Sequence, residues 1–435
     1  MPSVLLISTP FVGLAENQAR ALGMPDMPKV VLPHPLGGIA LEQVYAKLDA
    51  AFDEIVAKLT TSPALVAAAK SGGAAGTRVE VSAVDEWGDL QRELLGFGWG
   101  DGLPLVPPTE ARVQAMVDFC GWPAEHVVGV VEPGNGVATV ENIASNAVMA
   151  GCRPQHMPLL VAAVKALSDP RIFLRNIQAT THPISPMLIV SGPLTQALNI
   201  NCGSGLFGPG PWANGAIGRA LRLVMLNVGG GKPIVIDKAT MGHPGKYSYC
   251  MAENEAANPW ASLRAERDFD AQTSTVTVFG CESPHNINDH ESTTAGGLLT
   301  TICGTMAQTG QNNVYDPCEL LLILSPEHAA TIAGDGYSKD DVRRSIYDGA
   351  RMPMTRFSRE NIERRLWRYL ARRYRNRPID TQVVVVQQPE DVLILVAGGP
   401  GKHSMYAPTS GSSHSVTCPI IKSDGSPWLP SDFQA

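Results

Sequence analysis

The stretch NINCGSGLFGPGPWANGAIGRALRLVMLNVGGG, residues 199–231, joins a glycine-rich loop to a helix-like segment, and the fold expected for the chain is organised around it. Its second half carries apolar residues at spacings of four, three and four, namely Ile217, Leu221, Val224 and Val228. This period predicts a helix with one buried face. Asn214 is the expected N-cap of that helix, and the glycines at 229–231 mark its expected end.

The loop in front of this helix has two interpretations. Backbone N–H groups at a helix N-terminus attract carboxylate, phosphate or thiolate groups, because they are unpaired and lie at the positive end of the helix dipole. The residues expected to form such an anion site are Gly203, Ser204, Gly205, Asn214 and Arg219, with Arg222 three positions further on the same face. The alternative is a tight packing turn under a core helix. The glycine spacing fits neither the dinucleotide fingerprint nor a P-loop, so it does not indicate a nucleotide.

Composition bounds the class of protein. The chain has 435 residues, 44% of them hydrophobic and 17% charged, with a formal net charge of −7, which favours a globular protein and argues against non-specific nucleic-acid binding. No apolar run reaches the roughly 18 residues that a membrane span needs, and the start, MPSVLLISTPF, lacks the basic segment of a signal peptide. The eight cysteines include no CxxC pair, as expected of reduced thiols in a cytoplasmic protein.

Strand and helix patterns alternate through most of the chain, which predicts an α/β fold with mixed sheets and flanking helices. We expect two lobes and a partial N-terminal fragment. The expected divisions are 1–60 for the α/β fragment, which resembles the end of a split domain, 61–83 for a linker, 84–232 for the first lobe, 233–410 for the second lobe and 411–435 for a loop-rich tail. The expected elements include a helix over 41–59, a strand over 233–237 and a basic helix over 359–377.

Three loops that follow expected strands share glycine and proline: GHPGK at 242–246, GPGKH at 399–403 and the central GPGPW. Loops at strand ends are where open α/β folds bind ligands. Lys246 and Lys402 are therefore candidates for binding an anionic group, and His403 is a candidate acid or base. Asp101, in the constrained loop GWGDGLP, is a candidate for substrate contact, with a turn residue as the alternative. The two lysine-bearing loops also suggest a pseudo-repeated α/β unit, although the surrounding sequences do not align well enough to establish one.

A second group of candidates mixes thiol, carboxylate and imidazole side chains. Cys250 and Glu253 lie close together in KYSYCMAENE, and His182 and His285 lie on other loops. Such a set can hold zinc or iron, so a transition metal ion is the candidate cofactor, although the spacings match no known metal signature. Each histidine also has a plain interpretation as a hydrogen-bonded loop residue.

A metal-free alternative uses a cysteine as nucleophile. The candidates are Cys250, Cys202 and Cys152, with the thiol acidified by a helix N-terminus or by a nearby histidine or lysine. The plain alternative is that each of these thiols belongs to the core.

Several of these motifs together resemble the UGSC-motif (seleno)protein family. The blocks that carry the resemblance are PFVGLAENQARALGMPDMPKVVLPHPLGG, GWGDGLPLVPPT, NAVMAGCRP, QATTHP, the central stretch, KYSYCMAENE, SPHN and AGGPGKHS, over roughly residues 10–410. The resemblance implies thiol or selenol redox chemistry, and residue by residue it points to Cys152, His182, Cys250, Glu253, Lys402 and His403. The UGSC motif itself is absent from this chain, in which no cysteine precedes Cys120.

These observations favour an enzyme, or an enzyme subunit, that acts on a small anionic organic substrate by thiol- or selenol-dependent redox or elimination chemistry. Cys250, Glu253, His403, Lys402 and Cys152 are its expected catalytic residues. We expect a separate, smaller subunit to complete the N-terminal domain and to carry the redox motif, with a homodimer as the competing arrangement. A metal-dependent lyase or hydrolase, and a non-catalytic substrate-binding or scaffold subunit, are the alternatives.

Overall fold

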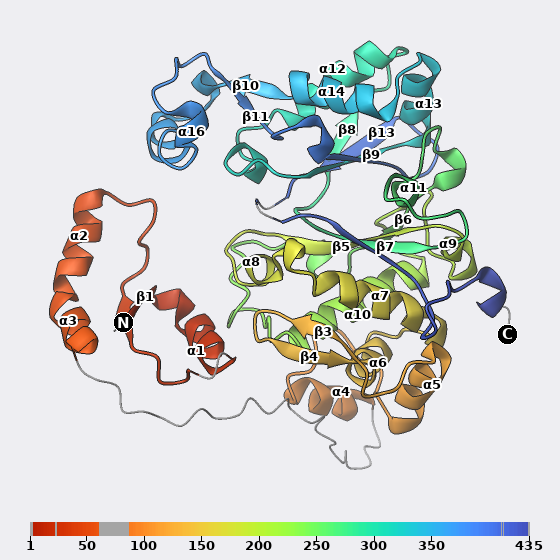
Figure 1. The fold of residues 1–435 in the computed structure, drawn as a ribbon, viewed down its shortest axis with the longest axis horizontal. Helices are drawn as coiled ribbons and strands as arrows, with labels where there is room; N and C mark the ends of the chain where they lie inside the picture. The colour runs from red at the N-terminus through yellow and green to blue at the C-terminus, as the bar shows by residue number, and fades with distance from the viewer. Residues whose placement is uncertain (1–2, 22–23, 61–86, 410, 412, 434–435) are drawn as a thin grey trace.

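The computed structural model describes residues 3–21, 24–60, 87–409, 411 and 413–433, so the expected linker over 61–83 lies outside the described residues. Its centre is a pair of four-stranded mixed sheets that pack face to face (Figure 1). Helices cover the outer face of each sheet, α7 and α10 on one side and α12, α13 and α14 on the other. The α/β class with mixed sheets and flanking helices is therefore confirmed.

The first sheet has the strand order β14-β7-β5-β6. Its strands are β5 (Ser185–Ser191), β6 (Cys250–Ala252), β7 (Thr275–Cys281) and β14 (Val416–Pro419). β6 is parallel to β5, whereas β7 is antiparallel to β5 and to β14. The sheet thus takes strands from both sides of residue 232.

The second sheet has the strand order β12-β9-β13-β8. Its strands are β8 (His285–Asn288), β9 (Leu320–Leu324), β12 (Val392–Val396) and β13 (His403–Ala407). β12 is parallel to β9, whereas β13 is antiparallel to β9 and to β8.

Alternation along the strands produces two buried faces on each sheet. In β5, Met187 and Ile189 point between the sheets, and in β9, Leu321 and Ile323 meet them there. The intervening residues of the same strands, such as Leu188, pack against the helices. Because both faces are buried, β5, β9 and β12 have almost continuous apolar sequences.

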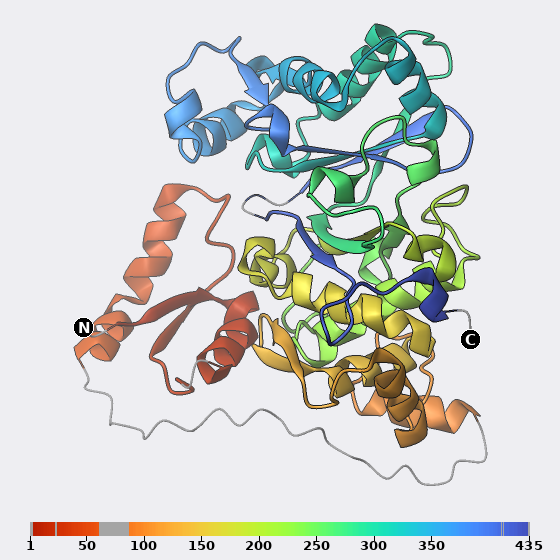
Figure 2. The same ribbon diagram turned by 45° about the vertical axis from the view of Figure 1, so that its right-hand side comes forward.

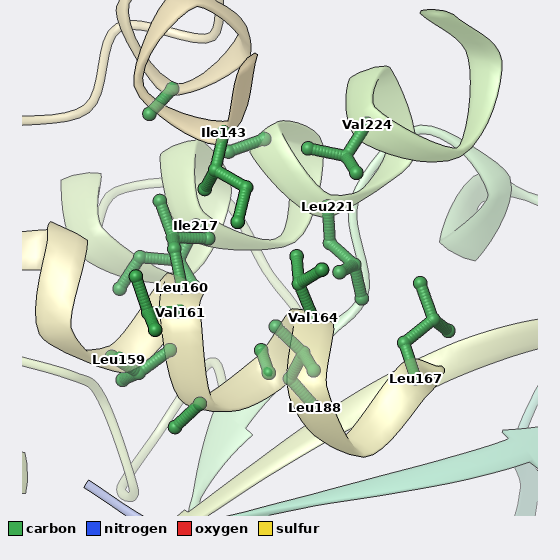
Figure 3. Packing of buried hydrophobic residues seen from close by; sticks show 14 of the residues in the cluster. Ile143, Leu159, Leu160, Val161, Val164, Leu167, Leu188, Ile217, Leu221 and Val224 are labelled. Atoms are coloured by element: carbon green, nitrogen blue, oxygen red, sulfur yellow. The ribbon is translucent and has the colours of Figure 1, made fainter. Parts of the chain in front are cut away.

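Three long helices lie on the outer side of the first sheet: α7 (Met157–Leu167) and α10 (Trp212–Asn227) cover the sheet, and α6 (Val140–Met149) packs against α10. Figure 3 shows Leu160 and Val164 of α7 between Ile217 and Leu221 of α10 and Leu188 of β5. The apolar period of the central stretch thus creates the helix that was expected from it. The second sheet is covered in the same way by α12 (Ala295–Met306), α13 (Pro326–Gly334) and α14 (Lys339–Gly349).

The two sheets have the same strand order, strand orientations and register. In the first, Leu188 pairs with Cys250 on one side and with Val278 on the other. In the second, Leu322 pairs in the same way with Ile394 and Tyr406. The outer strands also match: Val278 pairs with Val416, and Tyr406 pairs with His285. The core of the chain is therefore a pseudo-repeat of one four-stranded unit. The two lysine-bearing loops that suggested a repeat are not equivalent in it, because residues 242–246 precede β6 whereas residues 399–403 follow its counterpart β12.

The fourth strand of each unit is exchanged between the halves. β7 leaves the first sheet and leads into β8 of the second, whereas β13 leaves the second sheet and leads into β14 of the first. At the crossing point Cys281 forms an antiparallel bridge with Thr409, its counterpart in the other unit. A pseudo-twofold axis therefore runs between the sheets, along the strands.

The remaining elements lie around this core. They are the hairpin β3 (Val127–Val131) and β4 (Gly136–Thr139), the pair β10 (Arg351–Pro353) and β11 (Gln382–Val384), and the helices α4 (Trp87–Gly96), α5 (Glu110–Cys120), α8 (Leu174–Gln178), α9 (Leu194–Ala197), α11 (Leu263–Glu266), α15 (Arg359–Asn361) and α16 (Ala371–Tyr374).

The N-terminal fragment lies to one side of the two sheets (Figure 2). Its elements are β1 (Leu5–Ser8), α1 (Val12–Ala21), β2 (Lys29–Leu32), α2 (Leu41–Ala50) and α3 (Phe52–Thr60). β1 and β2 form a two-stranded parallel sheet, and no other described strand pairs with either. The side chain of Gln18 in α1 donates a hydrogen bond to the carbonyl of Pro133, next to the β3–β4 hairpin.

Several expected elements are wrong. Residues 233–237 form a turn closed by a bridge between Pro233 and Asp237, and Ile234 is 83% exposed, so this is no strand. The basic helix over 359–377 is broken into α15, a π-helical turn over 362–366 and α16. The helix over 41–59 is interrupted at Ala51 between α2 and α3. The tail contains β14, which the sequence analysis missed.

The buried position of Leu188 provides a test of this packing. Its side chain is 0% exposed between β5 and the helices, so Leu188→Ala should lower the free energy of unfolding by about 2–5 kcal/mol. The control Ile234→Ala removes a side chain that is 83% exposed and should change it by less than about 0.5 kcal/mol. Denaturant unfolding measures both, and equal stabilities of the two variants would contradict the packing.

Candidate functional site

A pocket of about 370 Å³ lies where the carboxyl ends of strands from both sheets meet. Its walls come from the central loop, residues 199–211, from residues that follow β6 and β12, and from the first turns of α13. The lining residues are Gly203, Ser204, Asn254, Pro326, Glu327, Ala330, Gly398, Gly399 and Pro400. This volume is typical of a small-molecule site, and strand ends are its usual place in α/β folds.

Asparagine side chains fix the central loop against β6. Asn201 accepts a hydrogen bond from Gly203 N–H at 2.9 Å and donates one to the carbonyl of Ser204 at 3.0 Å. Asn214 accepts from Asn201 N–H at 2.8 Å and donates to the carbonyl of Cys250 at 3.1 Å. Asn214 is therefore a buried brace rather than the N-cap, a position that Pro211 occupies.

The two halves of the chain cross directly beneath the pocket. Gly398 N–H donates to the carbonyl of Cys202 at 2.8 Å, and Asn254 N–H donates to the carbonyl of Val396 at 2.8 Å. Asn254 and Gly398 are equivalent positions of the two units, each two residues beyond the end of its strand. The pocket thus lies at the end of the pseudo-twofold axis opposite the Cys281–Thr409 bridge.

Gly399 makes the closest contact across this junction. A Cβ on Gly399 would lie 1.8 Å from Oγ and 2.9 Å from Cα of Ser204. Any side chain here would therefore push the central loop away. The glycine that the sequence analysis noted in GPGKH is explained by this contact.

One charged side chain, Glu327, is found among the described residues that line the pocket. It is exposed at the second position of α13, whose N-cap Ser325 accepts a hydrogen bond from His328 N–H. Pro326 has no N–H, and the N–H groups of His328 and Ala329 donate to Ser325, so the N–H of Glu327 is the donor that this helix start offers to an anionic ligand group. The carboxylate of Glu327 supplies a complementary acceptor for a hydroxyl or ammonium group.

Glu253, an expected catalytic residue, lies behind the pocket rather than in it. Its carboxylate accepts hydrogen bonds from Ser191 Oγ at 2.8 Å, from Asn258 Nδ2 at 3.1 Å and from Leu263 N–H at 3.0 Å. The side chain is 2% exposed, and burial raises its pKa. This arrangement ties β6 to β5 and α11.

The expected thiols lie in or beside the core. Cys250 is 4% exposed, and burial raises the pKa of its thiol to about 12. Burial, and then the nearby Cys250, raise the pKa of Cys152 as well. Cys202 adjoins the pocket and is half-buried, and burial raises its pKa too. None of these environments acidifies a thiol.

Four further candidates are engaged in ion pairs elsewhere. Arg219 forms a two-pronged pair with Asp101 at 2.8 and 2.9 Å. Burial raises the pKa of Asp101, but the hydrogen bond and charge of Arg219 outweigh it and the pKa is lowered. Lys246 pairs with Asp237 at 2.6 Å, and His182 pairs with Glu282 at 2.8 Å. Gly205 of the central loop has a positive φ of 70° and does not line the pocket.

His403 and Lys402 lie at the start of β13 on the surface. The Nε2 atoms of His403 and His290 are 3.1 Å apart, and Lys402 donates to the carbonyl of His290 at 2.8 Å. His285 packs edge-on against Tyr406. Among the described residues no group of three or more histidine, cysteine, aspartate and glutamate side chains is arranged to hold a metal ion, so the structure does not assemble His182, His285, Cys250 and Glu253.

Glu327, Asn254 and Asn201 were not among the site residues predicted from the sequence. Glu327 had a usable signal, because SPE directly after the apolar run LLLIL is a typical helix start at a strand end. Asn201 and Asn254 had none, since their roles come from contacts made only in the folded chain.

Comparisons with known proteins support the resemblance for the N-terminal fragment. The model of the UGSC family matches residues 1–61, which is consistent with a UGSC-family protein. A search of curated proteins and a search of solved structures each found no match. Within the described residues, none of the helices has the length and apolar character that a membrane crossing requires.

The burial of Cys250 leads to a prediction about its reactivity. At pH 8 the native protein should leave Cys250 unmodified by iodoacetamide, because a thiol with a pKa of about 12 forms almost no thiolate. The same cysteine should react fully in denaturant. Peptide mass analysis after a timed exposure to iodoacetamide measures the labelled fraction of Cys250. Rapid labelling in the native protein would contradict the prediction and support Cys250 as a nucleophile.

Proposed function

We propose that this chain is the substrate-binding part of an enzyme and that a small anionic organic molecule binds in the pocket between Ser204, Glu327 and Gly399. The observation that carries the proposal is the convergence of strand-end loops from both halves of the chain on one pocket of suitable volume. A fitting ligand is a small carboxylic acid with a neighbouring hydroxyl or amino group. Main-chain N–H groups would hold the carboxylate, and Glu327 would accept from the second group.

The chemistry proposed for this site is thiol- or selenol-dependent redox or elimination, with the reactive group supplied by a second polypeptide. Two observations support this division. The cysteines near the pocket have raised pKa values rather than lowered ones. The fragment that matches the UGSC family has a sheet of two strands, with which no other described strand pairs and which a partner could extend.

A non-catalytic substrate-binding subunit is the second candidate. The engagement of Glu253 with Ser191 and Leu263, together with the burial of Cys250, favours it, because these side chains serve the core. It shares the pocket and the partner with the first candidate. The two candidates differ in the effect of substituting Glu327. In an enzyme the substitution changes the turnover of the complex, whereas in a binding subunit it changes only the affinity for the ligand.

A pair of matched substitutions tests the pocket. Glu327→Gln should weaken the binding of small hydroxy or amino acids about tenfold or more, since a hydrogen bond to a charged group contributes about 1.5–3 kcal/mol. Glu141→Gln is its control, because Glu141 is also an exposed glutamate at the second position of a helix. Titration calorimetry against a panel of such acids gives the affinities.

Gly399→Ala tests the same pocket through its shape. The added methyl group meets Ser204, including its Cα, so this variant should displace the central loop and lose ligand binding. Gly304→Ala in α12 is the control, because a Cβ there meets nothing within 4 Å. Unchanged affinity in both Glu327→Gln and Gly399→Ala would place the ligand elsewhere.

Substitutions on the two-stranded sheet of the N-terminal fragment test whether a second polypeptide associates with it. Leu6 of β1 and Val31 of β2 are each 43% exposed and lie on opposite faces of this sheet, whereas parallel sheets are normally covered on both faces. Val31→Glu should therefore abolish association with the second polypeptide without unfolding the chain. Val127→Glu on the β3–β4 hairpin, where the side chain is 54% exposed, is the control.

Purification from the native source followed by mass measurement reports the association. A complex that Val31→Glu disrupts and Val127→Glu preserves supports the partner. A lone homo-oligomer of this chain with full activity contradicts it.

A further inference from the structure

A polar cluster lies near the start of β5, at the end of the first sheet's strands opposite the pocket. Its members come from α10, from the loop before β5, from the loop before β6 and from the end of β7. They are His182, Arg222, Asp237, His243, Lys246 and Glu282, and we call them the Arg222 cluster. Hydrogen bonds and ring contacts connect them into one group.

Arg222 is the cation of this cluster whose side chain is not paired with a carboxylate. It is 6% exposed, and its Nη2 donates to Ser185 Oγ at 2.8 Å. Its Nε is buried and has no hydrogen-bond partner among the described residues. The nearby carboxylates are engaged by other cations, Asp237 by Lys246 and Asp101 by Arg219.

His243 supplies a second unpartnered atom beside it. Ser185 Oγ, which accepts from Arg222, donates to the carbonyl of Gly245, and Gly245 N–H donates to Nδ1 of His243. Because Nδ1 is the acceptor, the neutral ring carries its proton on Nε2. Nε2 is buried and has no partner in the described part of the chain.

His182 closes the cluster on the other side. Its Nε2 lies 2.8 Å from Glu282 Oε1, and its buried Nδ1 also has no partner among the residues that the structure describes. The carbonyl of Glu282 accepts from Tyr249 O–H, and the ring of Tyr249 lies edge-on to His243 at 5.6 Å. Three unpartnered polar atoms thus occur within one connected group.

We propose that the Arg222 cluster binds a small oxyanion, with Arg222 Nε–H and His243 Nε2–H as its donors. A buried cation without a counter-ion costs several kcal/mol, and a buried polar atom without a partner is rare, so a ligand with one negative charge satisfies both needs. A carboxylate has that charge at neutral pH and accepts two parallel hydrogen bonds. Phosphate shares the chemistry but carries more negative charge than Arg222 alone offsets.

The electrostatics of the cluster agree with this assignment. Burial lowers the pKa of Arg222 to about 10, against the opposing charges of Asp237 and Asp101. Burial, followed by the charges of Lys246 and Arg222, lowers the pKa of His243 to about 4, so its ring is a neutral donor at pH 7. The site is separate from the pocket of the proposed function and stands or falls independently of it.

Anion titration of the full chain tests the proposal. At constant ionic strength and pH 7, sodium acetate and sodium phosphate are each exchanged for sodium chloride while the thermal unfolding midpoint is followed, because a ligand of the native state raises it with concentration. Acetate should raise the midpoint and bind in calorimetry. A response to phosphate alone would overturn the carboxylate assignment, and equal responses to all three salts would overturn the site.

Substitutions then locate the effect. Arg222→Gln and His243→Gln should each weaken acetate binding tenfold or more. Arg264→Gln should not, although Arg264 is also poorly exposed, with its side chain 11% exposed and paired with Glu255. If Arg222→Gln fails to fold, His243→Gln decides alone, since that side chain is only part-buried. Full acetate affinity in His243→Gln would overturn the proposal.

Discussion

The apolar layer between the two sheets is the constraint on which the rest of the molecule depends. Met187, Ile189 and Phe279 from one sheet meet Leu321 and Ile323 from the other, so each sheet loses its solvent-exposed face. The outer faces must then be covered as well, which α7 and α10 do on one side and α12 and α14 on the other. With both faces buried, the strand ends remain open to ligands, and the pocket and the Arg222 cluster both lie at strand ends.

The elements predicted correctly are those whose own residues show, by an apolar run or a helical spacing, which faces are buried. LLLIL and VLILV are apolar throughout because both their faces are covered, and the four-three-four spacing in the central stretch marks α10. β14 could not be found in this way, because VTCP is a short edge strand whose partner β7 lies far away in the sequence. Residues 233–237 have strand-like composition, but a bridge between Pro233 and Asp237 closes them into a turn.

Site residues were predictable to the extent that glycine marks close approach. Gly203 and Gly399 line the pocket, as loops at strand ends should, and Ser204 lies between them. The roles of charged and amide residues were less accessible, because their partners come from distant segments. Asn214 has the sequence position of a cap, yet Asn201 and Cys250 orient its side chain. Arg219 and Arg222 are three apart on one helix, but only Arg219 meets a carboxylate.

The exchange of β8 and β14 between the sheets makes the pseudo-repeat resemble a strand-swapped dimer joined into one chain. Neither half holds a complete set of strands, so the two cannot be separated by cutting the chain once without leaving a sheet short of a strand and exposing its edge. Interlocked halves of this kind should unfold together as one cooperative unit. They also fix the loops after β6 and β12 relative to each other, so the strand topology itself determines the shape of the pocket.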